Sequence, residues 1–68
     1  MKQSEIKPGY LYYGKSGSHR EVTAIVTDRD GYPAVSYINR GNRQRKSIRL
    51  VGFAQWARAS LGPAGETP

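Results

Sequence analysis

The chain contains no cysteine and only one histidine, and these two features limit the chemistry that it can support. Without cysteine, neither a disulfide framework nor a thiolate metal site can supplement the core. Because His19 is the sole histidine, a metal ion would need a mixed site with carboxylates. A chain of 68 residues also forms at most one domain, which is too small to enclose a large active site. We therefore expect no metal site and no cofactor.

Long apolar segments are also missing from the sequence. No run approaches the roughly 18 consecutive apolar residues that a membrane span requires. Residues 1–10 contain no apolar stretch of the kind found in signal peptides. We therefore expect a soluble, cytoplasmic protein without a membrane partner.

Acidic residues are scarce: five Asp and Glu stand against eleven Lys and Arg, which gives a formal net charge of +6. An excess of this size favours anionic partners. The excess is concentrated between Arg40 and Arg49, a segment that contains no acidic residue. Most of its cations are arginine, whose planar set of donors suits phosphate and carboxylate groups. The alternative explanation is that these charges keep strand faces and edges soluble.

The stretch from Val22 to Leu50 predicts three consecutive strands joined by two turns. The turns are Asp28-Arg29-Asp30-Gly31, read as a four-residue loop, and Gly41-Asn42, read as a two-residue loop. These lengths place one set of side chains on a common apolar face: Val22, Ala24, Val26, Val35, Tyr37, Ile48 and Leu50. The opposite face carries Thr23, Thr27, Ser36, Arg45, Ser47 and Arg49, with Ile25, Ala34 and Ile38 among them.

The remaining segments complete one domain over residues 8–61. Residues 1–7 are polar, and we expect them to be flexible. The aromatic run Tyr10–Tyr13 predicts a first strand. Apolar residues then recur with helical spacing from Phe53 to Leu61, which predicts a C-terminal helix over residues 53–61. Residues 62–68 are rich in glycine and proline and are expected to form a disordered tail.

Together these elements predict a mainly β fold, namely a strongly bent antiparallel sheet or partly open barrel of four to five strands with a short C-terminal helix. Three segments carry a resemblance: IKPGY at residues 6–10, the long strand REVTAIV, and SIRL followed by FAQWA. On these segments, which span roughly Ile6 to Leu61, the chain resembles the SH3-like small barrels, including KOW and Tudor-type modules and small proteins of phages and mobile elements. The C-terminal helix departs from the minimal modules. The resemblance implies a binding platform for nucleic acid or for protein.

A phosphate-binding pattern and a possible catalytic triad can be found in the sequence, but the segments around them do not fit those functions. Residues 9–16 satisfy the phosphate-binding pattern G-x-x-x-x-G-K-[ST], but the segment contains a predicted strand and is followed by another strand rather than a helix. A catalytic triad would have to combine Ser16 or Ser18 with the adjacent His19 and with Asp28, on a loop that offers no pocket. We therefore expect no enzymatic activity and no small-molecule substrate.

A nucleic-acid interface is the favoured interpretation of the basic segment, because arginine forks beside hydroxyl groups can contact phosphates. The predicted contacts are Arg40, Arg43, Arg45, Lys46 and Arg49, with Lys15 and Arg20 of a second basic loop. Tyrosines 10, 12 and 32 could stack on unpaired bases if they are exposed. These patterns do not choose between DNA and RNA.

A protein-interaction module is the alternative interpretation. In the predicted register Ile25 and Ile38 form an apolar pair bordered by Arg45 and Arg49, which is a plausible contact for a protein partner. The same pair could instead be covered by the C-terminal helix. A sheet edge could also add a strand from a partner or form a homodimer.

Overall fold

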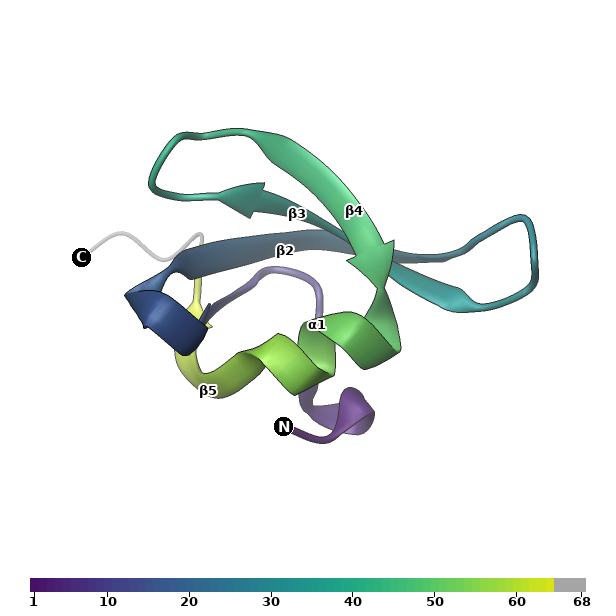
Figure 1. Cartoon of the computed structure of the whole chain (residues 1–68), viewed down its shortest axis with the longest axis horizontal. Coiled ribbons are helices and arrows are strands. Elements are labelled where there is room, and N and C mark those ends of the chain that lie inside the picture. Colours follow the sequence, from purple (N-terminus) through teal and green to yellow (C-terminus); the bar gives the residue numbers. More distant parts are fainter. Residues whose placement is uncertain (65–68) are drawn as a thin grey trace.

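The computed structural model describes residues 1–64 and contains five strands in a single antiparallel sheet with the order β4-β3-β2-β1-β5 (Figure 1). The elements are β1 (Tyr10–Gly14), β2 (His19–Thr27), β3 (Pro33–Asn39), β4 (Arg45–Arg49), α1 (Leu50–Trp56) and β5 (Ala57–Pro63). Because β4 and β5 lie at opposite ends of this order, the bent sheet stays open. The prediction of a mainly β fold with a strongly bent antiparallel sheet and a short helix is confirmed.

The loop between β2 and β3 is shorter than predicted. The Asp28 backbone N–H donates to the Tyr32 carbonyl oxygen at 2.8 Å, which leaves Arg29, Asp30 and Gly31 as the loop. Gly31 has a φ of +84°, a conformation that glycine adopts without steric cost. The Asp28 carboxylate oxygen Oδ1 accepts from the backbone N–H groups of Asp30 and Tyr32, both at 2.9 Å. The Asp28 carboxylate therefore builds the turn, as its residue type predicted, whereas Asp30 contributes only its backbone N–H to these bonds.

This shorter loop changes which side chains of β2 enter the core. A β-bulge in β2 separates two registers. Beyond the bulge, Val22 pairs with Tyr37 as predicted, whereas on the loop side Ile25 lies opposite Val35. Ile25 therefore packs against the core, and Val26 is 50% exposed. The bulge places two predicted core residues on the opposite face, Ala24 and Val26.

The pairing of β3 with β4 agrees with the prediction. Val35 lies opposite Ile48, and Tyr37 lies opposite Lys46. The loop itself is longer than two residues, because the Asn39 backbone N–H donates to the carbonyl oxygen of Gln44 at 2.8 Å. The predicted register is nevertheless correct, because the pair Asn39–Gln44 belongs to the same β3–β4 ladder that a two-residue Gly-Asn turn would have produced.

The predicted helix over residues 53–61 is wrong in its extent. Helix α1 begins at Leu50 and ends at Trp56, and the following residues form β5, which pairs with β1. Without β5, the outer edge of β1 would leave backbone N–H and C=O groups without partners, and this demand outweighs a helical spacing of apolar residues. Gly62 and Pro63, which were assigned to a tail, belong to β5. Ala64 donates its backbone N–H to the Gly9 carbonyl oxygen at 2.7 Å, and the last four residues of the predicted tail, 65–68, lie outside the described residues.

The core is centred on Phe53, whose side chain is fully buried. Its ring centroid lies 5.7 Å from that of Tyr12, 5.6 Å from that of Tyr37 and 5.2 Å from that of Trp56. Helix α1 thus covers one face of the bent sheet through a single aromatic cluster. Substantial area is buried in such a cluster, and edge-to-face contacts stabilise it further.

The N-terminal segment contacts this core through Ile6 and Met1. Ile6 is only 4% exposed. The Tyr12 hydroxyl accepts from the Lys7 backbone N–H at 2.8 Å and donates to the Glu5 carbonyl oxygen at 3.0 Å. Burial raises the pKa of the Tyr12 hydroxyl. This buried hydroxyl therefore fastens the N-terminal segment to β1.

Candidate nucleic-acid interface

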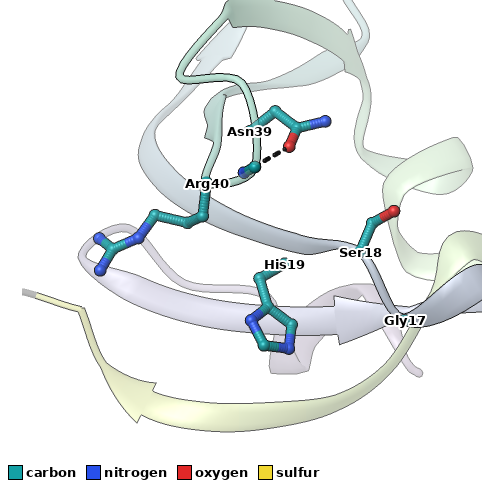
Figure 2. Close-up of a pocket in the computed structure, with 6 residues that line it drawn as sticks. Gly17, Ser18, His19, Asn39 and Arg40 are labelled. Atoms are coloured by element: carbon teal, nitrogen blue, oxygen red, sulfur yellow. Dashed lines mark hydrogen bonds between the residues drawn. The ribbon is translucent and has the colours of Figure 1, made fainter.

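The loop at the end of the β3–β4 hairpin presents Arg40 and Arg43 on a hydrogen-bonded frame. The Asn39 side-chain oxygen accepts from the Gly41 backbone N–H at 3.0 Å, as Figure 2 shows, and the Arg43 backbone N–H donates to the Asn39 carbonyl oxygen at 2.7 Å. The Asn42 side-chain oxygen accepts from the Gln44 backbone N–H, also at 3.0 Å. These local bonds fix the backbone, so both arginine side chains extend from a defined loop. The Arg43 backbone is in the left-handed conformation, with a φ of 59°.

Along β4, cationic and hydroxyl side chains gather around a shallow hollow of about 380 Å³. We call its polar lining the β4 strip: Thr23, Ser36, Arg45, Lys46 and Ser47. Ser36 and Ser47 lie directly opposite each other in the β3–β4 pairing. Arg45, Lys46 and Ser47 are exposed on the edge strand of the sheet. The predicted combination of arginine with hydroxyl groups is thus present over β2, β3 and β4.

Ion pairs divide the predicted arginines into two groups. The Arg40 guanidinium lies 2.7 Å from a carboxylate oxygen of Glu21, and Arg49 lies within 3.4 Å of Asp28 and 3.1 Å of Asp30. By contrast, no ion pair within residues 1–64 involves the exposed cations Arg43, Arg45 and Lys46. These three cations form the most strongly cationic part of the hairpin, because no carboxylate among residues 1–64 forms an ion pair with them.

The second predicted basic loop does not join the hairpin surface as a whole. Arg20 is half-buried, with its guanidinium carbon 4.0 Å from the Trp56 ring centroid and 4.7 Å from that of Tyr37. Its Nε atom is buried and has no hydrogen-bond partner in the described part of the chain. Lys15 is exposed in the 3₁₀ turn Lys15–Gly17. Arg20 therefore acts as a cation packed between aromatic rings rather than as an exposed phosphate contact.

A hollow of about 270 Å³ separates this turn from the β3–β4 loop and is shown in Figure 2. Its walls are the segments 17–19 and 39–41, which are joined by a hydrogen bond from the Arg40 backbone N–H to the His19 carbonyl oxygen at 3.0 Å. The Arg40 side chain extends away from Ser18 and Asn39 because its guanidinium binds Glu21. The hollow is lined by Gly17, Ser18, His19, Asn39, Arg40 and Gly41.

The apolar pair proposed for a protein partner is not formed. Ile25 lies opposite Val35 and packs against the core, whereas Ile38 lies opposite Glu21 and Arg45 on the outer face. The β-bulge in β2 causes this separation, because it reverses the face on which Ile25 projects. The prediction that Ile25 and Ile38 share a surface is wrong.

Asp28 links the β2–β3 turn to Arg49 and provides a test of this end of the surface. The hydrogen bond from the Tyr32 backbone N–H, the bond from Asp30 and the nearby Arg49 charge lower the pKa of the Asp28 carboxyl below 3.8. Because the folded pKa is lower than the unfolded one, its stabilising effect is complete above pH 3.8 and is lost as the pH falls through the folded value. We expect NMR titration to give an Asp28 midpoint below 3.8. In Asp28→Asn the contribution of this carboxyl to the pH dependence of stability should vanish. An Asp28 midpoint at or above the unfolded value in the parent protein would contradict the turn geometry.

Two features of the surface had not been foreseen. Glu21 was not identified as the partner of Arg40, although the correctly predicted pairing of Val22 with Tyr37 places it diagonally across the strands. Asp28 and Asp30 were assigned only to the turn, and their contact with Arg49 carries no local signal because it joins a loop to the end of β4.

Comparison of the chain with models of protein families, with curated proteins and with solved structures found no match. Within residues 1–64 no helix is long and apolar enough to cross a membrane. The same residues contain no cluster of three or more His, Cys, Asp or Glu side chains suited to a metal ion.

Proposed function

We propose that the chain is a small non-enzymatic module that binds nucleic acid through the β3–β4 hairpin. One observation carries the proposal: Arg43, Arg45 and Lys46 are exposed, lie within four consecutive residues and are not engaged in ion pairs within the described residues. The hydroxyl groups of the β4 strip lie beside them. Arginine, lysine and hydroxyl donors are the side chains that most often contact phosphate and sugar oxygens.

The architecture supports this proposal by giving the polar side chains of β4 a fixed spacing. Arg45 and Ser47 lie on the same face of β4, two residues and therefore about 6.6 Å apart. We further propose that the chain is an SH3-like module, since a meander of four strands is followed by a short helix and by a fifth strand that returns to β1. On this view β4 is the edge at which a ligand is held.

Binding of the parent protein to labelled oligonucleotides is the direct test. Single-stranded DNA, single-stranded RNA and duplex DNA of mixed sequence would be titrated by fluorescence anisotropy at about 50 and 200 mM salt. With three to four phosphate contacts, we expect the affinity for single strands to fall roughly 20- to 50-fold over this range, because bound counterions are released. The absence of binding at the lower salt concentration, or an affinity independent of salt, would refute the proposal.

A second candidate function is addition of a strand from a protein partner to β4. The observation that favours it is the position of β4 at the end of an open sheet, with exposed residues 45–47. An acidic partner strand would suit this edge, whereas a second copy of the chain would oppose Arg45 and Lys46 with like charges. Capture of a protein by the parent chain, combined with no oligonucleotide binding at low salt, would favour this candidate.

A further inference from the structure

A second, less charged surface lies at the other end of β4, around Tyr32. Tyr32 and Val51 are 53% and 47% exposed, and they lie beside the same hollow rather than singly on the surface. Together with Gln3, Pro33 and Arg49 they line a hollow of about 260 Å³. We call this surface the Tyr32 platform. The N-terminal segment, the β2–β3 hairpin and α1 all contribute to it.

The Tyr32 ring is held in place before any ligand arrives. The Arg49 guanidinium carbon lies 4.3 Å from the ring centroid and therefore covers one face of the ring. Asp28 and Asp30 bind this guanidinium, and Asp28 also accepts from the Tyr32 backbone N–H at 2.9 Å. A ring held at both the backbone and one face loses little conformational freedom when a ligand stacks on the exposed remainder.

Charge distinguishes this platform from the β4 strip. The positive charge of Arg49 is offset by two carboxylates, so the platform is a poor site for a phosphate group. An aromatic ring beside apolar side chains is instead suited to the flat face of a nucleobase. The strip and the platform are connected, because Arg45, Ser47 and Arg49 project from the same face of β4 over about 13 Å.

We propose that the ligand is a single strand, whose phosphates lie along the β4 strip and one of whose unpaired bases stacks on Tyr32. This inference rests on the proposed nucleic-acid binding and adds the class of ligand to it. Bases of a duplex are already stacked on one another, so they are not available to the platform without unpairing. The chain therefore prefers single-stranded nucleic acid to a duplex of the same sequence.

An abasic oligonucleotide separates the two contributions, because it keeps the phosphates and removes the bases. Anisotropy titrations would compare single-stranded DNA, single-stranded RNA, the abasic strand and duplex DNA for the parent, Tyr32→Ala and Tyr32→Trp. Tyr32→Ala should weaken binding of base-containing single strands by about 5- to 150-fold. It should have no such effect on the abasic strand, and Tyr32→Trp should retain the affinity. The stronger of the DNA and RNA complexes identifies the natural sugar.

The outcomes separate this inference from the function on which it rests. Equal affinity for normal and abasic strands, with a steep salt dependence and no effect of Tyr32→Ala, would overturn base stacking while leaving phosphate binding intact. No binding of any oligonucleotide would overturn both. Upfield shifts of the Tyr32 ring protons on addition of single strands, observed by NMR in the parent protein, would support stacking independently of affinity.

Discussion

Replacing Gly14 with alanine should remove a large part of the folding stability of the protein. Gly14 is the last residue of β1 and lies directly against Trp56, so an added Cβ would overlap both the indole ring and the Trp56 carbonyl oxygen. Neither group can move freely, because Trp56 ends α1 and its ring packs on Phe53. Overpacking typically costs about 1 to 3 kcal/mol, and the overlap with a backbone oxygen places Gly14→Ala at the upper end, about 3 kcal/mol. A domain of this size has only about 3 to 5 kcal/mol of stability.

Gly52→Ala is the matched control, since it adds the same methyl group to the same small domain. Gly52 lies within α1, and its added Cβ would meet only the Ile48 Cδ1 atom, at 4.0 Å. Alanine should stabilise the helix by about 0.5 to 1 kcal/mol. Thermal unfolding followed by circular dichroism should show a Tm lowered by about 12 °C or more for Gly14→Ala and raised by a few degrees for Gly52→Ala. Similar values for the two variants would contradict the packing of Trp56 on β1.

The β3–β4 register could be derived from the sequence, but the β2–β3 register could be derived only in part. The alternation of Val35 and Tyr37 with Ile48 determines the first, and the closing pair of the loop keeps the same ladder. In β2, a loop shortened by one residue and a bulge of one residue compensate each other. No residue type in β2 indicates the bulge, because the strand contains neither glycine nor proline.

The C-terminal third shows how tertiary demands override local patterns. Residues from Phe53 to Leu61 have helical spacing, yet only the portion up to Trp56 is helical. An isolated helix of this length gains little from propensity, whereas β5 satisfies the open edge of β1 and completes the sheet. Such a choice depends on which edge of β1 is free, and this information is not local to the segment.

The candidate site was predictable in composition but not in electrostatics. Clustering of arginines between Arg40 and Arg49 is visible in the sequence, and so are the hydroxyl residues of the opposite strand. The sequence does not reveal that Arg49 is engaged by two aspartates, or that Arg20 is packed between Tyr37 and Trp56. These contacts join residues far apart in the chain. Because Arg49 and Arg20 are engaged in this way, the predicted nucleic-acid contacts are reduced to those near the hairpin loop and the β4 strip.

Reversing the charges of Arg45 and Lys46 tests this reduced set, and we expect it to have the largest effect on binding. Each phosphate contact is worth roughly tenfold in affinity at 50 mM salt through counterion release. The double variant Arg45→Glu, Lys46→Glu should therefore bind single strands at least about 50-fold more weakly. The slope of log affinity against log salt should become shallower by about 1.4 for the loss of two contacts. Anisotropy titrations at several salt concentrations measure both quantities.

The matched control is the double variant Lys7→Glu, Arg58→Glu, which changes the net charge by the same amount. Both side chains are exposed; Arg58 lies on β5 at the opposite edge of the sheet, and Lys7 precedes β1. Only long-range attraction is lost here, and it is screened beyond about 10 Å at 0.1 M salt. The control should therefore bind within about fivefold of the parent and keep its salt slope. Equal losses in the two variants would mean that net charge alone drives binding, and the hairpin would then have no special role.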